Sequence, residues 1–85
     1  MDDAAGWYEA RRPGLGLQFL TSADACVQRI CRMPEMYERV YGNYRRALIR
    51  RFPYAVFYDF VGSTVTVYCI CHTSRDADKW RQRLP

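Results

Sequence analysis

The second half of the chain carries short runs of β-branched and aromatic residues, the pattern of β-strands. The runs cover 44–51, 54–61 and 64–72. Phe52-Pro53 separates the first two, and Gly62-Ser63 separates the last two. Proline cannot donate a ladder hydrogen bond, and Gly-Ser favours a tight turn. We therefore expect a three-stranded antiparallel meander over 44–72.

In the first half, apolar residues recur at intervals of three and four, as on one face of a helix. They are Phe19, Leu20, Ala23, Cys26, Val27 and Ile30. This helix should end near Met33-Pro34, and the segment from Asp2 to Arg12 predicts a helix before it, acidic first and basic last. The pattern predicts an α+β fold, with a helical hairpin over 2–33 packed on a small twisted sheet.

Two segments give weaker signals. Residues 34–43 show no clear period, and Gly42-Asn43 indicates a turn, so we expect a loop with one helical turn. The tail 76–85 predicts a short helix, with Asp76 as its N-cap. With only 85 residues, the chain 1–85 should form a single domain.

Both faces of the predicted sheet are apolar, although a sheet covered by helices on one side is normally polar on the other. Alternation places Tyr54, Val56, Tyr58 and Phe60 opposite Ala55, Phe57 and Val61, and places Val65, Val67, Cys69 and Cys71 opposite Tyr68 and Ile70. We expect a protein partner to cover the second, Tyr-rich face. The alternative is a sheet twisted enough for the chain's own loops to cover both faces.

The net charge of +4 is concentrated in the sheet and tail. Residues 1–43 hold five arginines against six acidic residues, whereas 44–85 hold seven arginines and one lysine against three aspartates. Such a basic half favours an acidic partner, either a nucleic acid or an acidic protein segment. The alternative is an ordinary solvated face.

No apolar run is long enough to span a membrane, and the start of the chain is acidic where a signal peptide would be basic. We therefore expect a cytoplasmic protein without a membrane partner. The four cysteines fit this interpretation as small buried hydrophobes rather than disulfides: Cys26, Cys31, Cys69 and Cys71.

The residues favour binding over catalysis. His72 is the only histidine, and alternation places it opposite Cys69 and Cys71, so neither a nucleophilic triad nor a zinc site is predicted. We expect His72 to be hydrogen-bonded near Asp76, and we expect no metal and no cofactor. The abundant arginines bind phosphate or carboxylate well but are poor general bases.

Three stretches resemble the ParE branch of the ParE/RelE toxin superfamily from bacterial type II toxin–antitoxin systems. They cover 7–16, 45–58 and 72–83, and include the patterns Arg-Phe-Pro-Tyr and His-x-x-Arg-Asp-x-x-x-Trp-x-x-Arg. The resemblance implies a cognate antitoxin that wraps the toxin, and DNA gyrase as the target, without sequence-specific binding to nucleic acid. Members of that family usually begin with a β-strand, whereas here Asp2-Asp3-Ala4-Ala5 already falls in the first predicted helix, so either the chain is truncated or the sheet lacks this strand.

The resemblance implies two sets of site residues. Target contacts are expected from His72, Arg75, Trp80, Arg81 and Arg83, and antitoxin contacts from Arg46, Arg50, Tyr54 and Tyr58. A RelE-like messenger RNA interferase using Arg45, Arg50 and Arg75 is the alternative, although Lys79 is the only lysine and Trp80 lacks the hydroxyl of a tail tyrosine. A third possibility is an inactive scaffold that only co-folds with its antitoxin.

Overall fold

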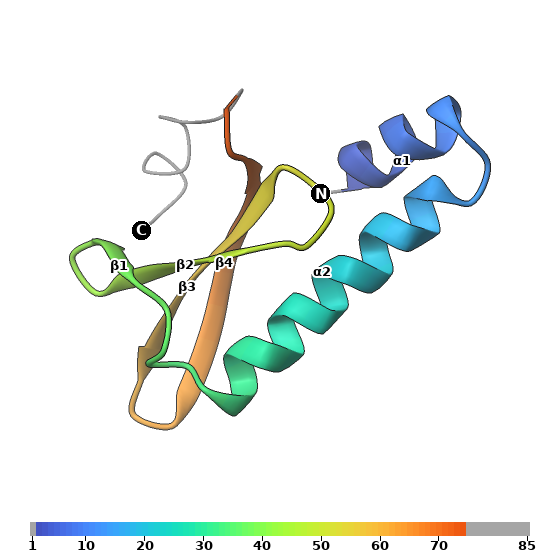
Figure 1. Cartoon of the computed structure of the whole chain (residues 1–85). Helices are drawn as coiled ribbons and strands as arrows, with labels where there is room; N and C mark the ends of the chain where they lie inside the picture. Colours follow the sequence, from blue (N-terminus) through green and yellow to red (C-terminus); the bar gives the residue numbers. More distant parts are fainter. Residues whose placement is uncertain (1, 75–85) are drawn as a thin grey trace.

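The computed structural model describes residues 2–74, which form two helices and a four-stranded antiparallel sheet (Figure 1). The elements are α1 (Asp2–Arg11), α2 (Leu15–Arg32), β1 (Arg39–Tyr41), β2 (Tyr44–Leu48), β3 (Tyr54–Val61) and β4 (Thr64–His72). The strands lie side by side in chain order. No helix in this part of the chain is long and apolar enough to cross a lipid bilayer.

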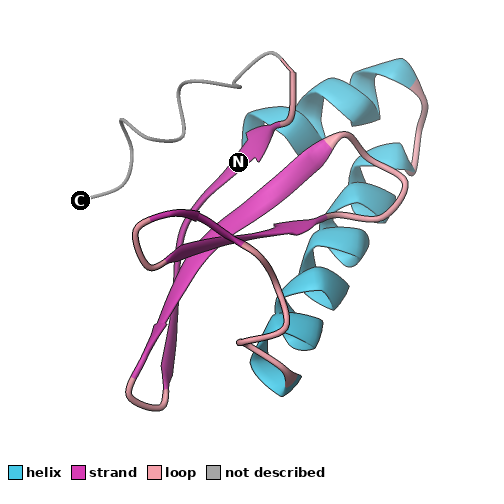
Figure 2. Cartoon of the chain, turned by 60° about the vertical axis from the view of Figure 1, so that its left-hand side comes forward, coloured by secondary structure: helices cyan, strands magenta, loops and turns pink. Residues whose placement is uncertain are grey.

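The helices form the expected hairpin, and both lie on one side of the sheet (Figure 2). Gly14 makes the turn with φ of 88°, a conformation that favours glycine. The Glu9 carboxylate of α1 then accepts hydrogen bonds from the amides of Gly14 and Gly16, both at 3.0 Å. A carboxylate at this position satisfies free amides and stabilises the positive end of the α2 dipole.

The apolar stripe of α2 packs on the sheet, as its period predicts. Phe19, Ala23, Cys26 and Ile30 are buried, whereas Leu20 at the edge of the stripe is 39% exposed. The sheet contributes Ala47, Val56 and Tyr58 to the same cluster. One continuous core therefore joins the second helix to the middle strands.

The prediction of three strands is wrong by one strand. Residues Arg39–Tyr41, within the segment expected to be a loop, form β1 and pair with β2. Gly42 has φ of 56°, so the turn signal at Gly42-Asn43 closes a β-hairpin. A strand of three residues is too short to show alternation, which is why the sequence pattern does not reveal it.

The first predicted strand is also shorter than expected. It ends at Leu48, so Arg50 and Arg51 lie in the connection to β3 rather than in the strand expected over 44–51. Arg51 has φ of 73°, which no strand residue adopts. The change of direction there brings Arg50 toward α2.

The expectation that Tyr54 and Tyr58 lie on an exposed face awaiting a partner is wrong. Tyr54 and Tyr58 belong to the core on the helix side, where they are 7% and 0% exposed. The opposite face carries a second buried cluster, made of Ala55, Phe57, Cys69 and Cys71, with Val40 of β1 packed against it. The chain itself therefore contributes to covering this face.

A β-bulge explains a further error in the predicted faces. Phe57 pairs with Cys69, but the next residue, Tyr58, pairs with Val67, so β4 has one extra residue, Tyr68. Val67 consequently lies on the helix side of the sheet, and Cys69 on the opposite side. Simple alternation had placed both on one face.

Candidate functional site

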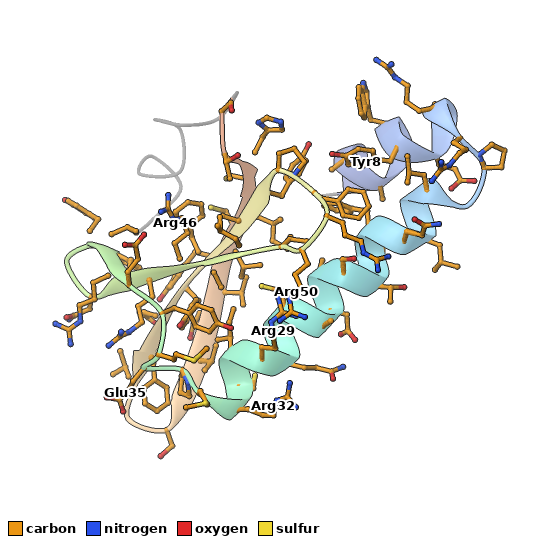
Figure 3. All side chains as sticks on the ribbon, viewed as in Figure 1. Tyr8, Arg29, Arg32, Glu35, Arg46 and Arg50 are labelled. Atoms are coloured by element: carbon orange, nitrogen blue, oxygen red, sulfur yellow. The ribbon has the colours of Figure 1, made fainter. Side chains whose placement is uncertain are left out.

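A groove lies beside the last turns of α2. Its main hollow has a volume of about 470 Å³. It is lined by Arg29, Met36, Tyr37, Glu38, Arg46, Leu48 and Arg50. The side chains of Arg29 and Arg50 come from different elements and meet at this hollow (Figure 3).

Two further hollows extend the groove around the end of α2. They have volumes of about 430 and 440 Å³ and share Arg32, Met33 and Met36. The first also shares Arg29 and Met36 with the main hollow. We call this continuous surface the α2-end groove, defined by Arg29, Arg32, Met33, Met36, Arg46, Leu48 and Arg50.

The groove exposes three large hydrophobic side chains. Met33, Met36 and Leu48 are 57%, 59% and 58% exposed. A single exposed hydrophobe needs no explanation, but several that line adjoining hollows are typical of an interaction surface. Methionine is flexible and polarisable, so it adapts to the shape of a partner.

The rim of the groove carries more basic than acidic side chains, with four arginines against two glutamates, Glu35 and Glu38. Arg46 forms an ion pair with Glu38 at 2.6 Å, and both side chains are substantially exposed. Such a pair contributes at most about 1 kcal/mol to stability. Among residues 2–74, Arg29, Arg32 and Arg50 form no ion pair with a carboxylate. Three guanidinium groups therefore remain able to bind an acidic ligand.

Two strand residues hold the segment that carries Met36. The Tyr58 hydroxyl donates to the Pro34 carbonyl at 2.7 Å. Arg45 donates to the carbonyls of Glu35 and Tyr37, at 3.1 and 2.6 Å. Burial raises the pKa of Tyr58 to about 12, although the nearby Arg45 opposes this shift. The phenol therefore stays protonated and keeps donating at neutral pH.

Cys26 joins α2 to β2 directly beneath the groove. Its thiol approaches the carbonyls of Ala47 and Leu48, at 3.8 and 3.6 Å. Burial raises the pKa of this thiol, and Arg29 partly offsets the effect. The group therefore remains a neutral thiol that packs in the core.

The structure separates the predicted antitoxin residues. Arg46 and Arg50 lie together at the α2-end groove, whereas Tyr54 and Tyr58 are buried beneath the helices. A partner could reach the two tyrosines only if the core opened. Tyr58 instead shapes the groove indirectly, through its hydrogen bond to Pro34.

His72 is the last residue of β4. Its ring lies 5.1 Å from that of Tyr54, and its Nδ1 accepts a hydrogen bond from the Ser74 amide at 3.0 Å. The other predicted target residues, Arg75, Trp80, Arg81 and Arg83, lie outside the described residues, as do Asp76 and the predicted helix in 76–85.

The cysteines do not assemble a metal site in the part of the chain that the structure describes. Cys69 and Cys71 have their sulfurs 3.1 Å apart, but residues 2–74 contain no group of three potential ligands. Strand pairing places His72 beside Tyr54 and Cys71 beside Ala55, on opposite faces, as alternation predicts.

Sequence reasoning missed most of the groove. Arg29 and Arg32 belonged to no predicted site, and neither did Met33, Met36 and Leu48. The one available signal was the aperiodic segment 34–43 with its exposed methionine.

Comparisons with known proteins find no matching sequence family and no matching curated protein.

Proposed function

We propose that this chain is a ParE-like toxin of a bacterial type II toxin–antitoxin system, which acts on DNA gyrase and is neutralised at the α2-end groove. The resemblance at 7–16, 45–58 and 72–83 motivates the class of protein. The observation that carries the proposal is the groove itself, where guanidinium groups surround exposed methionine and leucine side chains.

This chemistry suits an amphipathic, acidic segment of an antitoxin. Its apolar side chains would cover Met33, Met36 and Leu48, removing their exposed surface from water. Its carboxylates would approach Arg29, Arg32 and Arg50, and arginine binds carboxylate with two parallel hydrogen bonds. Opposite charges would also accelerate the encounter.

The alternative, a RelE-like interferase, gains little from the geometry. It assigns phosphate binding to Arg45, but this guanidinium already donates to two backbone carbonyls that fix the groove wall. Replacing those contacts with a phosphate would release the segment that carries Met36. Target binding therefore remains the better-supported role, with Trp80 and Arg81 as the contacts that the resemblance suggests.

A supercoiling reaction of purified gyrase, titrated with the folded chain, tests this function. We expect supercoiling to fall and linear DNA to accumulate, because a gyrase poison traps the cut intermediate. The double variant Trp80→Ala/Arg81→Ala should lose both effects. Trp7→Ala/Arg11→Ala removes the same residue types from α1, where Arg11 lies 4.3 Å from the Trp7 ring, and should keep them.

Absence of any effect from the folded wild-type chain would contradict the gyrase assignment. A ribosome-dependent translation extract then separates the alternatives. Messenger RNA cleavage there would support the interferase, and no effect in either assay would support an inactive scaffold.

A further inference from the structure

The two edges of the sheet differ in how they are protected. Unpaired edge strands invite pairing with other chains, and proteins normally shorten, bend or charge them. β1 follows this rule: it has only three residues, begins with Arg39, and shifts register between Arg39 and Tyr41. It offers a second chain almost no regular edge.

β4 lacks most of these devices, and the one that it has is the bulge at Tyr68. In the described part of the chain it is the terminal strand of the sheet, with β3 as its one neighbour. Its nine residues include no lysine, arginine, acidic residue, proline or glycine. Thr64-Val65-Thr66-Val67-Tyr68, its first half, consists entirely of residues that favour strands.

The first half of β4 is also accessible. Thr64 and Thr66 are exposed, and Val67 is 40% exposed on the helix side of the sheet. The second helix packs chiefly on β2 and β3, so the helical layer leaves Val67 partly bare. Val61, just before the β3–β4 turn, is 63% exposed. An apolar, uncharged edge is thus combined with unburied valines.

We infer that β4 pairs antiparallel with β4 of a second copy, through Thr64–Tyr68, around a two-fold axis at Thr66. In this register Thr66 faces its own copy, and each Val65 faces the other chain's Val67. Threonine pairs and β-branched apolar pairs both stabilise neighbouring strands. The result is one continuous sheet across the dimer, with each Val67 covered.

The charge pattern favours a second copy as the occupant. Self-pairing places residue 66 directly opposite its own copy, where a charge would meet its like, and the whole segment Thr64–Tyr68 carries no charge. Two-fold pairing also closes the assembly, because the short, bulged β1 edge resists the head-to-tail contact that would extend it. This inference does not depend on the proposed function.

Charge substitutions at Thr66 test the dimer and its register together. Thr66→Lys would place two ammonium groups face to face, and we expect dimer affinity to fall at least tenfold in sedimentation velocity. Thr66→Glu should act likewise, whereas an equal mixture of the two variants should form a heterodimer. Thr21→Lys and Thr21→Glu, at an exposed position of α2, are the matched controls and should leave the dimer intact.

These experiments can support or contradict the pairing of β4 with a second copy. A wild-type chain that stays monomeric at high micromolar concentration overturns the proposal. So do Thr66 variants that still dimerise, Thr21 variants that also dissociate, or a mixture of the two Thr66 variants that stays monomeric. If the Thr66 variants fail to fold, amide hydrogen exchange of the wild-type chain replaces them. Protection of Thr64–Tyr68 should then rise with protein concentration, and protection independent of concentration contradicts the pairing.

Discussion

The two ends of α2 lie in contrasting environments. Near its start, Phe19 is fully buried among aromatic rings from α1 and the β2–β3 region. Its ring centre lies 5.2 Å from that of Phe52 and 5.1 Å from that of Tyr54. Near its end, Met33 and Met36 are more than half exposed beside arginine side chains. The same helix is therefore buried near Phe19, which we call the sealed end, and exposed near Met33 and Met36, which we call the open end.

This difference separates stability from binding. Edge-to-face aromatic packing excludes water and stabilises the folded chain, and it leaves nothing for a partner to contact. Exposed methionines contribute little to folding, but they gain free energy when a partner covers them. Substitutions at the sealed end should therefore affect folding, and those at the open end should affect binding.

The largest effect is expected at Phe19. Phe19→Ala should lower the free energy of unfolding by about 3–5 kcal/mol, because it leaves a cavity among rings that cannot collapse fully. Leu48→Ala, at the open groove, should change it by no more than about 0.5 kcal/mol. Urea denaturation followed by circular dichroism measures both. Equal losses would contradict the division between the two ends.

The next effect concerns the contact between α1 and α2. A Cβ at position 16 would lie 2.6 Å from the Ala5 carbonyl oxygen, so Gly16→Ala should destabilise the chain by about 1–3 kcal/mol. Gly6→Ala meets no atom within 4 Å, and should stabilise α1 by about 0.5–1 kcal/mol. Thermal unfolding should show opposite shifts in Tm. Shifts of the same sign would mean that the helices do not pack this closely.

A smaller effect is expected where the core supports the groove. Tyr58→Phe removes the hydrogen bond to the Pro34 carbonyl and should cost about 1 kcal/mol. The folded-state pKa of about 12 exceeds that of an exposed tyrosine, about 10. As pH rises, the Tyr58 phenol therefore loses its proton first in the unfolded chain. The stability that the protonated phenol contributes is complete below about pH 10 and is lost as pH rises toward 12.

Urea denaturation at several alkaline pH values measures this loss. The wild-type chain should lose up to about 1.4 kcal/mol per pH unit through Tyr58 above pH 10. Tyr58→Phe should lack this contribution. Identical alkaline slopes for the two proteins would show that the Tyr58 phenol is not protected by burial.

The sealed end could be predicted from the sequence, whereas the open end could not. The period of Phe19, Ala23, Cys26 and Ile30 is a local signal, and it identified both α2 and the face that packs on the sheet. The groove instead joins Arg29, Met36 and Leu48 from three segments. Its geometry depends on the short strand β1 and on the end of β2 at Leu48, neither of which leaves a periodic pattern.

The prediction of which residues lie on each face of the sheet was wrong for a similar reason. One extra residue in β4 reverses the side on which every later residue lies, and no local pattern around Tyr68 announces it. Tyr54 and Tyr58 were assigned to the partner surface through the family resemblance. In the fold, the Tyr58 hydroxyl finds a partner at Pro34, so its ring can be buried at little cost.

Binding of an acidic helical peptide tests most directly whether the open end receives a partner. The probe is a fluorescein-labelled amphipathic peptide with leucines along one face and glutamates along the other, followed by fluorescence anisotropy. Arg50→Glu, in the groove, and Arg12→Glu, exposed between the two helices, change the net charge equally. We predict that Arg50→Glu weakens binding about tenfold or more, while Arg12→Glu changes it less than about twofold. Equal weakening by both variants, or no binding to the wild-type chain, would contradict the assignment of the groove as the partner surface.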